Sequence, residues 1–182
     1  MNYGEEIAAV KKYDDEATKE KLLAAESHLS TVRLIVLLLC TFIYHFILDD
    51  YFKINWLATV IMALAFTFSA VMYFYKPYRK YPLSLIRVFS VMVDGIFIAL
   101  WIYSTGGADS PFYMLWCFSI IAVAQRFSFK ETMLVSVLYA ITYYLMVWSD
   151  PFHDVEVAEL VVRISFIPVT GILGAYFSRE LA

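Results

Sequence analysis

Asp94 and Arg163 are charged residues inside otherwise apolar stretches of this sequence, where a charge is energetically expensive. Asp94 is embedded in the run RVFSVMVDGIFIALW, and Arg163 lies within the first two helical turns of the run that begins at Val157. A carboxylate at the centre of a bilayer costs about 3 kcal/mol on insertion scales, so its side chain must face protein or water. Asp94 therefore indicates either a hydrogen bond between helices or a site that senses a proton or another signal.

We hypothesise that Asp94 and Arg163 form an ion pair. If their helices cross the bilayer in opposite directions, Asp94 lies about 16 Å from one face and Arg163 about 10 Å from the other. In a hydrocarbon layer of about 30 Å the remaining difference in depth is a few ångströms, which a long guanidinium side chain can bridge. The alternative is that Arg163 extends its charged end to the outer headgroups.

A glycine-rich turn follows the run that contains Asp94. It comprises Thr105, Gly106, Gly107, Ala108, Asp109, Ser110 and Pro111. Gly106 and Gly107 can end a helix in the left-handed conformation. Asp109 or Ser110 can cap the next helix, and Pro111 fits its first turn. The backbone donors at such a helix start could hold a carboxylate-bearing ligand, although turn formation alone also explains these residues.

The last apolar run contains residues suited to relaying a movement. Pro168 removes one backbone hydrogen bond and is expected to kink the helix. Gly171 and Ala175 are four residues apart, a spacing that allows close helix packing. We therefore assign Pro168 and Gly171 to a relay.

We expect neither a metal site, a cofactor nor catalytic activity in this chain. The candidate metal ligands have unspecific spacing; they are His45, Asp49, Asp50, Asp150, His153, Asp154 and Glu156. No known motif for hydrolysis or nucleotide binding occurs. Cys40 and Cys117 lie in apolar runs and are interpreted as buried free thiols.

The amino-acid composition indicates that the apolar stretches carrying these residues lie in a membrane. Of 182 residues 62% are hydrophobic and 17% are charged, against about 45–50% and about 25% in soluble domains. Six apolar runs of nearly spanning length follow residue 30: Thr31–Leu48, Ile54–Tyr75, Leu85–Tyr103, Pro111–Phe127, Glu131–Trp148 and Val157–Phe177. With short connections they predict an all-α integral membrane protein, a six-transmembrane-helix antiparallel bundle.

The distribution of cations predicts the orientation of this bundle. Eleven of the 14 Lys and Arg residues fall on one side, Lys53 falls on the other, and Arg87 and Arg163 lie within spans. Both termini are therefore expected to be cytoplasmic. Residues 1–30 are charged and weakly amphipathic, which predicts a cytoplasmic surface helix or, alternatively, a dimerising or regulatory arm. With a net charge of -3 and no basic stripe, nucleic acid is not an expected partner.

Residues 83–148 resemble the N-terminal membrane sensor region of bacterial receptors. The matching features are Asp94, the turn Thr105-Gly-Gly, the helix start Ser110-Pro111-Phe112 and the pair Arg126-Phe127. Similar regions occur in pilus-regulating histidine kinases, in hybrid kinases that sense fatty-acid quorum signals, and before nucleotide cyclase domains.

This resemblance implies a sensor module in the bacterial cytoplasmic (inner) membrane. Residues 31–178 would be the sensor domain, and residues 179–182 the start of an output helix. The resemblance does not identify the ligand, and we separately expect a lipophilic or membrane-associated signal. A homodimer is expected because such outputs act in pairs. A small transporter or channel, and an inert anchor, are the competing hypotheses.

Overall fold

The computed structural model describes residues 3–47, 56–149 and 156–180, and residues 3–18, 47, 179 and 180 by their backbone alone. All regular structure in these ranges is helical. The elements are α1 (Tyr3–Phe42), the π-helical η1 (Ile43–Ile47), α2 (Trp56–Ala70), the π-helical η2 (Val71–Tyr75), the 3-10 helices η3 (Pro77–Arg79), η4 (Gly107–Asp109) and η5 (Pro111–Met114), α3 (Leu83–Ser104), α4 (Leu115–Ala124), α5 (Phe129–Trp148) and α6 (Val157–Glu180).

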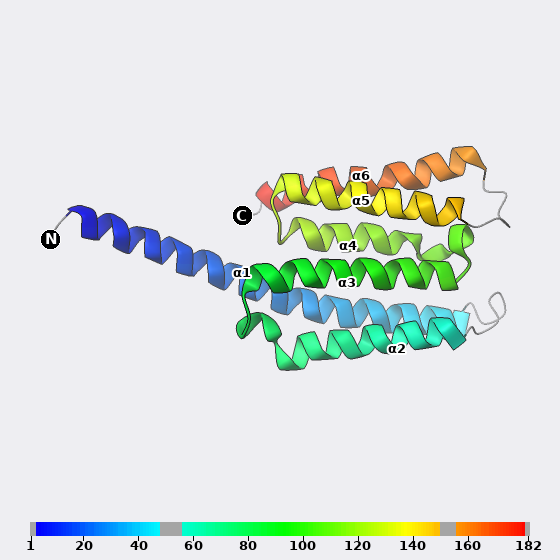
Figure 1. Ribbon diagram of the computed structural model, residues 1–182, viewed down its shortest axis with the longest axis horizontal. Helices are drawn as coiled ribbons and strands as arrows, with labels where there is room; N and C mark the ends of the chain where they lie inside the picture. Colours follow the sequence, from blue (N-terminus) through cyan, green and yellow to red (C-terminus); the bar gives the residue numbers. More distant parts are fainter. Residues whose placement is uncertain (1–2, 48–55, 150–155, 181–182) are drawn as a thin grey trace.

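The helices lie side by side in one bundle (Figure 1). α2 packs against α1 and α3 at one edge of the bundle, and α4 packs against α3, α5 and α6. The N-terminal part of α1 extends beyond the bundle, at the same end where α6 finishes. The all-helical prediction is confirmed, and the first and last described helices leave the bundle at one end.

Within the described ranges, five helices are long and apolar enough to cross a membrane. The segment Pro111–Ala124 is apolar but shorter. It begins as a 3-10 turn and ends before Gln125, which explains why the predicted fourth run is longer than the helix. These features are compatible with a multi-pass membrane protein.

Large apolar side chains point outward along the helices. Phe46, Phe74 and Trp148 each expose about three quarters of their surface, at 76%, 77% and 77%. Soluble monomers rarely expose apolar patches of this extent. The outer surface therefore suits a hydrocarbon solvent, as the composition requires.

The first helix continues across residue 30, where the charged N-terminal segment meets the first apolar run. α1 is one helix of 40 residues that passes through residue 30 without a break. The apolar run from Thr31 is therefore a continuation of the charged helix before it.

Candidate functional site

Asp94 pairs with Arg33, and the predicted pair with Arg163 is wrong. Arg33 Nη2 on α1 lies 2.5 Å from Asp94 Oδ2 on α3. The same nitrogen donates to Ser90 Oγ at 2.7 Å, one turn before Asp94. The two charged side chains are 13% and 17% exposed. Side chains of α1 reach α3, so Arg33 is the ion-pair partner of Asp94. Arg163 had been predicted as the partner only from its estimated depth in the bilayer.

A second ion pair, between α1 and the end of α4, is more completely buried in the protein. Arg126 Nη1 is 3.5 Å from Glu26 Oε1, and both side chains are only 1% exposed. Arg126 Nε also donates to the Ala122 carbonyl at 3.0 Å. An arginine stays protonated even when buried, so the pair places two opposite charges in the interior. Removing either partner would leave an uncompensated charge there.

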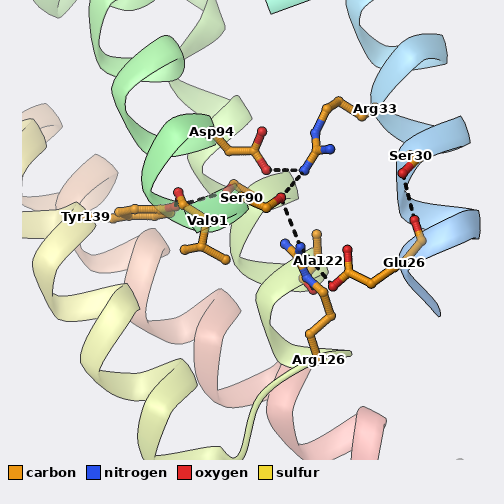
Figure 2. Close-up of polar contacts among 10 residues, drawn as sticks. Glu26, Ser30, Arg33, Ser90, Val91, Asp94, Ala122, Arg126 and Tyr139 are labelled. Atoms are coloured by element: carbon orange, nitrogen blue, oxygen red, sulfur yellow. Dashed lines mark hydrogen bonds and ion pairs between the residues drawn. The ribbon is translucent and has the colours of Figure 1, made fainter. Parts of the chain in front are cut away.

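Ser90 connects the two pairs. Its hydroxyl oxygen accepts from Arg33 at 2.7 Å and from Arg126 Nη1 at 3.3 Å. Figure 2 shows Arg33, Asp94, Ser90, Arg126 and Glu26 as one chain of polar contacts between α1, α3 and the end of α4. We call these five residues the charge network. It holds two cations and two carboxylates, so its formal charge is zero.

An apolar cavity of about 140 Å³ lies beside the charge network. Arg33, Asp94 and Arg126 form part of its wall. The remaining wall comes mainly from apolar residues of α1, α2, α3 and α4, among them Cys40, Met62, Phe97 and Phe118. An apolar cavity of about 150 Å³ is large enough to bind benzene. This cavity therefore has room for a hydrocarbon group of similar size next to a charged wall.

Two polar atoms in this wall are buried and lack a partner in the described part of the chain. They are Ser69 Oγ and Trp101 Nε1, on residues that are 0% and 5% exposed. Both residues line the cavity. Buried polar groups are normally hydrogen-bonded, so an unpaired one calls for an explanation. A ligand with a hydrogen-bond acceptor is one such explanation.

The predicted turn forms as its residues indicate. Gly106 and Gly107 have φ of 113° and 58°, in the left-handed region that favours glycine. Ser110 Oγ caps η5 by accepting from the Phe112 amide at 3.3 Å, and it lies 2.7 Å from Thr105 Oγ1. Pro111 occupies the first turn of η5. Thr105 and Ser110 are fully engaged inside the turn, which favours its structural interpretation.

Arg163 holds this turn against α5 and α6. Its guanidinium donates to the Ala108 carbonyl and pairs with Glu159, one turn earlier on α6. It also donates to Tyr143 Oη at 3.4 Å and lies over the Tyr113 ring, 4.7 Å from its centroid. The structure thus brings Arg163 together with the turn and leaves Asp94 in a separate cluster.

The predicted relay residues lie where α6 packs most closely. A Cβ on Gly171 would overlap Ser136 Oγ of α5, and one on Gly174 would lie 3.3 Å from Ala124 Cβ of α4. Ala175 is buried, and the backbone stays helical through Pro168. Gly171 is therefore a close-packing position.

The remaining predicted features separate into two groups. Cys40 and Cys117 are both free thiols, as predicted, but only Cys40 is buried and Cys117 is half-buried. Among the described residues no group of three potential ligands could hold a metal, while Asp49, Asp50, Asp150, His153 and Asp154 lie outside the described residues.

Sequence reasoning missed Glu26, Arg33, Ser90 and Arg126 as site residues. Glu26 and Arg33 were counted only among the charges of the predicted cytoplasmic side, and Arg126 was counted there and as part of the Arg126-Phe127 resemblance. A usable signal was present: Glu26 and Arg33 are seven residues apart, on the helix face that also carries Cys40. Ser90 and Asp94 are likewise one turn apart on α3.

Comparisons with protein-family models, with curated proteins and with solved structures found no match to this chain.

Proposed function

We propose that this chain is the membrane sensor module of a bacterial signal-transduction protein. The observation that carries the proposal is the cavity between α1 and α4, with the charge network as one wall. In this proposal the bundle has six spans in the inner membrane, both ends are cytoplasmic, and the working unit is a homodimer. A lipophilic ligand enters the cavity from the bilayer.

The buried charges supply the two states that a sensor needs. Each arginine has a carboxylate partner on another helix, so a displacement of α1 must break or exchange these contacts. A ligand shifts the equilibrium between such states only if it binds one of them better. A group that fills the cavity beside Asp94 favours the arrangement of α1 that leaves the cavity open.

The output follows from the shared end of α1 and α6 (Figure 1). α6 packs closely against α4 and α5, whereas α1 contacts α3 and α4 through the long side chains of Arg33 and Glu26. We propose that α1 moves relative to α6, and that a kinase or cyclase domain attached beyond α6 responds to this movement.

A fusion of a cytoplasmic histidine-kinase domain after Ala182 tests this function. In proteoliposomes we expect Arg33→Gln and Asp94→Asn to change autophosphorylation in the same direction, by about 5-fold or more, the effect of a coupling energy of 1 kcal/mol or more. Lys21→Gln is the matched control, because it removes an exposed charge from the same helix. It is expected to leave the output unchanged.

Two results would contradict the sensor proposal. One is an unchanged output from folded Arg33→Gln and Asp94→Asn variants. The other is protein-dependent solute flux in the same vesicles that is lost with Asp94→Asn, which would support the transporter or channel hypothesis instead.

A further inference from the structure

A second hollow lies outside the charge network, between α1 and the connection from α2 to α3. It has a volume of about 830 Å³ and is lined by residues 78–83 of the connection and by one face of α1, namely Lys19, Glu20, Leu23, Ala24, Ser27 and His28. Its polar residues include Lys19, Glu20, His28, Arg79 and Lys80. We call it the basic groove.

The charges of the basic groove favour an anion. Lys19, Arg79 and Lys80 are exposed cations, against the single carboxylate of Glu20. Within the described residues none of the three cations forms an ion pair, and Lys80 Nζ lies 3.9 Å from the centroid of the Tyr75 ring. The cations are therefore available to a ligand.

A buried hydroxyl points to the same kind of ligand. Tyr78 is 2% exposed, and its ring packs with Met72 and Ile86 beneath the basic groove. Its Oη has no hydrogen-bond partner in the part of the chain that the structure describes, and Tyr78 lines the groove. An oxygen-rich anion would supply the missing acceptor.

The backbone that carries these residues is strained. Lys76 has a φ of 50°, in the left-handed region. Among the described residues it is the only one other than glycine with a positive φ. It directs the chain into η3, which presents Tyr78, Arg79 and the following Lys80. Such strain persists only where the surroundings enforce it, and it often marks a binding site.

The position of the groove selects the source of the anion. The cation distribution assigns this end of the bundle to the cytoplasmic face, and the exposed rings of Tyr75 and Tyr81 flank the connection as interface aromatics. Anionic lipid headgroups are concentrated there, and each nearby Lys or Arg strengthens their binding. We propose that the basic groove binds the phosphate of an anionic lipid headgroup, with Tyr78 Oη donating to a phosphate oxygen. This inference requires membrane insertion but does not depend on the sensor function.

Thermal unfolding of the full chain in mixed micelles tests the proposal. Added phosphatidylglycerol is expected to raise Tm, whereas phosphatidylcholine is not. Lys19→Gln with Lys80→Gln should weaken the apparent lipid affinity about tenfold or more. Tyr78→Phe, which removes only the hydroxyl, should weaken it severalfold.

The matched control is Lys21→Gln with Lys130→Gln. It removes the same charge from exposed positions outside the basic groove, and it should retain the affinity within about twofold. An equal loss in this control would show general charge attraction and overturn the proposal, as would equal effects of the two lipids. If inorganic phosphate alone raises Tm as much as phosphatidylglycerol does, the lipid assignment is wrong.

Discussion

The two halves of the bundle are held together by different interactions. α4, α5 and α6 pack closely through small residues, with Gly171 of α6 directly over Ser136 of α5. α1 is joined to α3 and α4 by the ion pairs of Arg33 and Arg126, and a cavity of about 140 Å³ lies between them. Close packing has one arrangement, whereas long side chains can exchange partners. In the proposed mechanism α1 is therefore the helix that moves, and α6 is the fixed reference.

The largest effect is expected at the buried pair. Arg126→Met leaves the Glu26 carboxylate buried without its partner, so the free energy of unfolding should fall by about 3–5 kcal/mol. Glu26→Gln combined with Arg126→Met should recover most of this loss, because neither charge remains. Reversible unfolding in mixed micelles measures both variants. If the single variant is as stable as the parent chain, the pair does not hold α1.

A smaller effect is expected in the closely packed half. Gly171→Ala places a methyl group against Ser136 and should cost about 1–3 kcal/mol of stability, whereas adding Ser136→Ala should restore part of it. Gly174→Ala is the matched control on the same helix. Its Cβ meets Ala124 at 3.3 Å, and the higher helix propensity of alanine, about 1 kcal/mol, offsets this contact. Equal effects at both glycines would remove the distinction between the halves.

The smallest effect is expected from filling the cavity. Ala65 is buried and lines the cavity, so Ala65→Leu should raise stability by about 0.5–2 kcal/mol. The same variant should abolish stabilisation by benzene, used as an apolar probe in the unfolding experiment. Ala63→Leu, at an exposed position of the same helix, should do neither. A benzene effect that survives Ala65→Leu would place the probe elsewhere.

Much of the fold could be predicted from the sequence because hydrocarbon demands long apolar helices. The predicted runs Leu85–Tyr103 and Glu131–Trp148 lie within two residues of α3 and α5 at each end. The α3–α4 turn was also predictable, since glycine in the left-handed region and a serine cap are local effects. The length of the short fourth helix was harder to predict. It ends at Ala124, whereas the predicted apolar run continues to Phe127 and gives no signal for the turn.

The candidate site was predictable only in part, because ion pairing depends on which helices are neighbours. The apolar residues around Asp94 identified it as a site residue, but they did not indicate its ion-pair partner. Depth in the bilayer made Arg163 a candidate, yet α6 packs on α4 and α5, and Arg163 binds the turn at Ala108. Arg33 looked like a boundary cation, since a single sequence does not reveal that α1 faces Asp94.

A pair of double-mutant cycles tests the central claim most directly, that Asp94 acts through α1. The first combines Arg33→Gln with Asp94→Asn, and the second combines Arg163→Gln with Asp94→Asn. Unfolding free energies should show a coupling of about 1 kcal/mol or more in the first cycle, and additivity within about 0.5 kcal/mol in the second. Coupling of Asp94 to Arg163 without coupling to Arg33 would contradict the account.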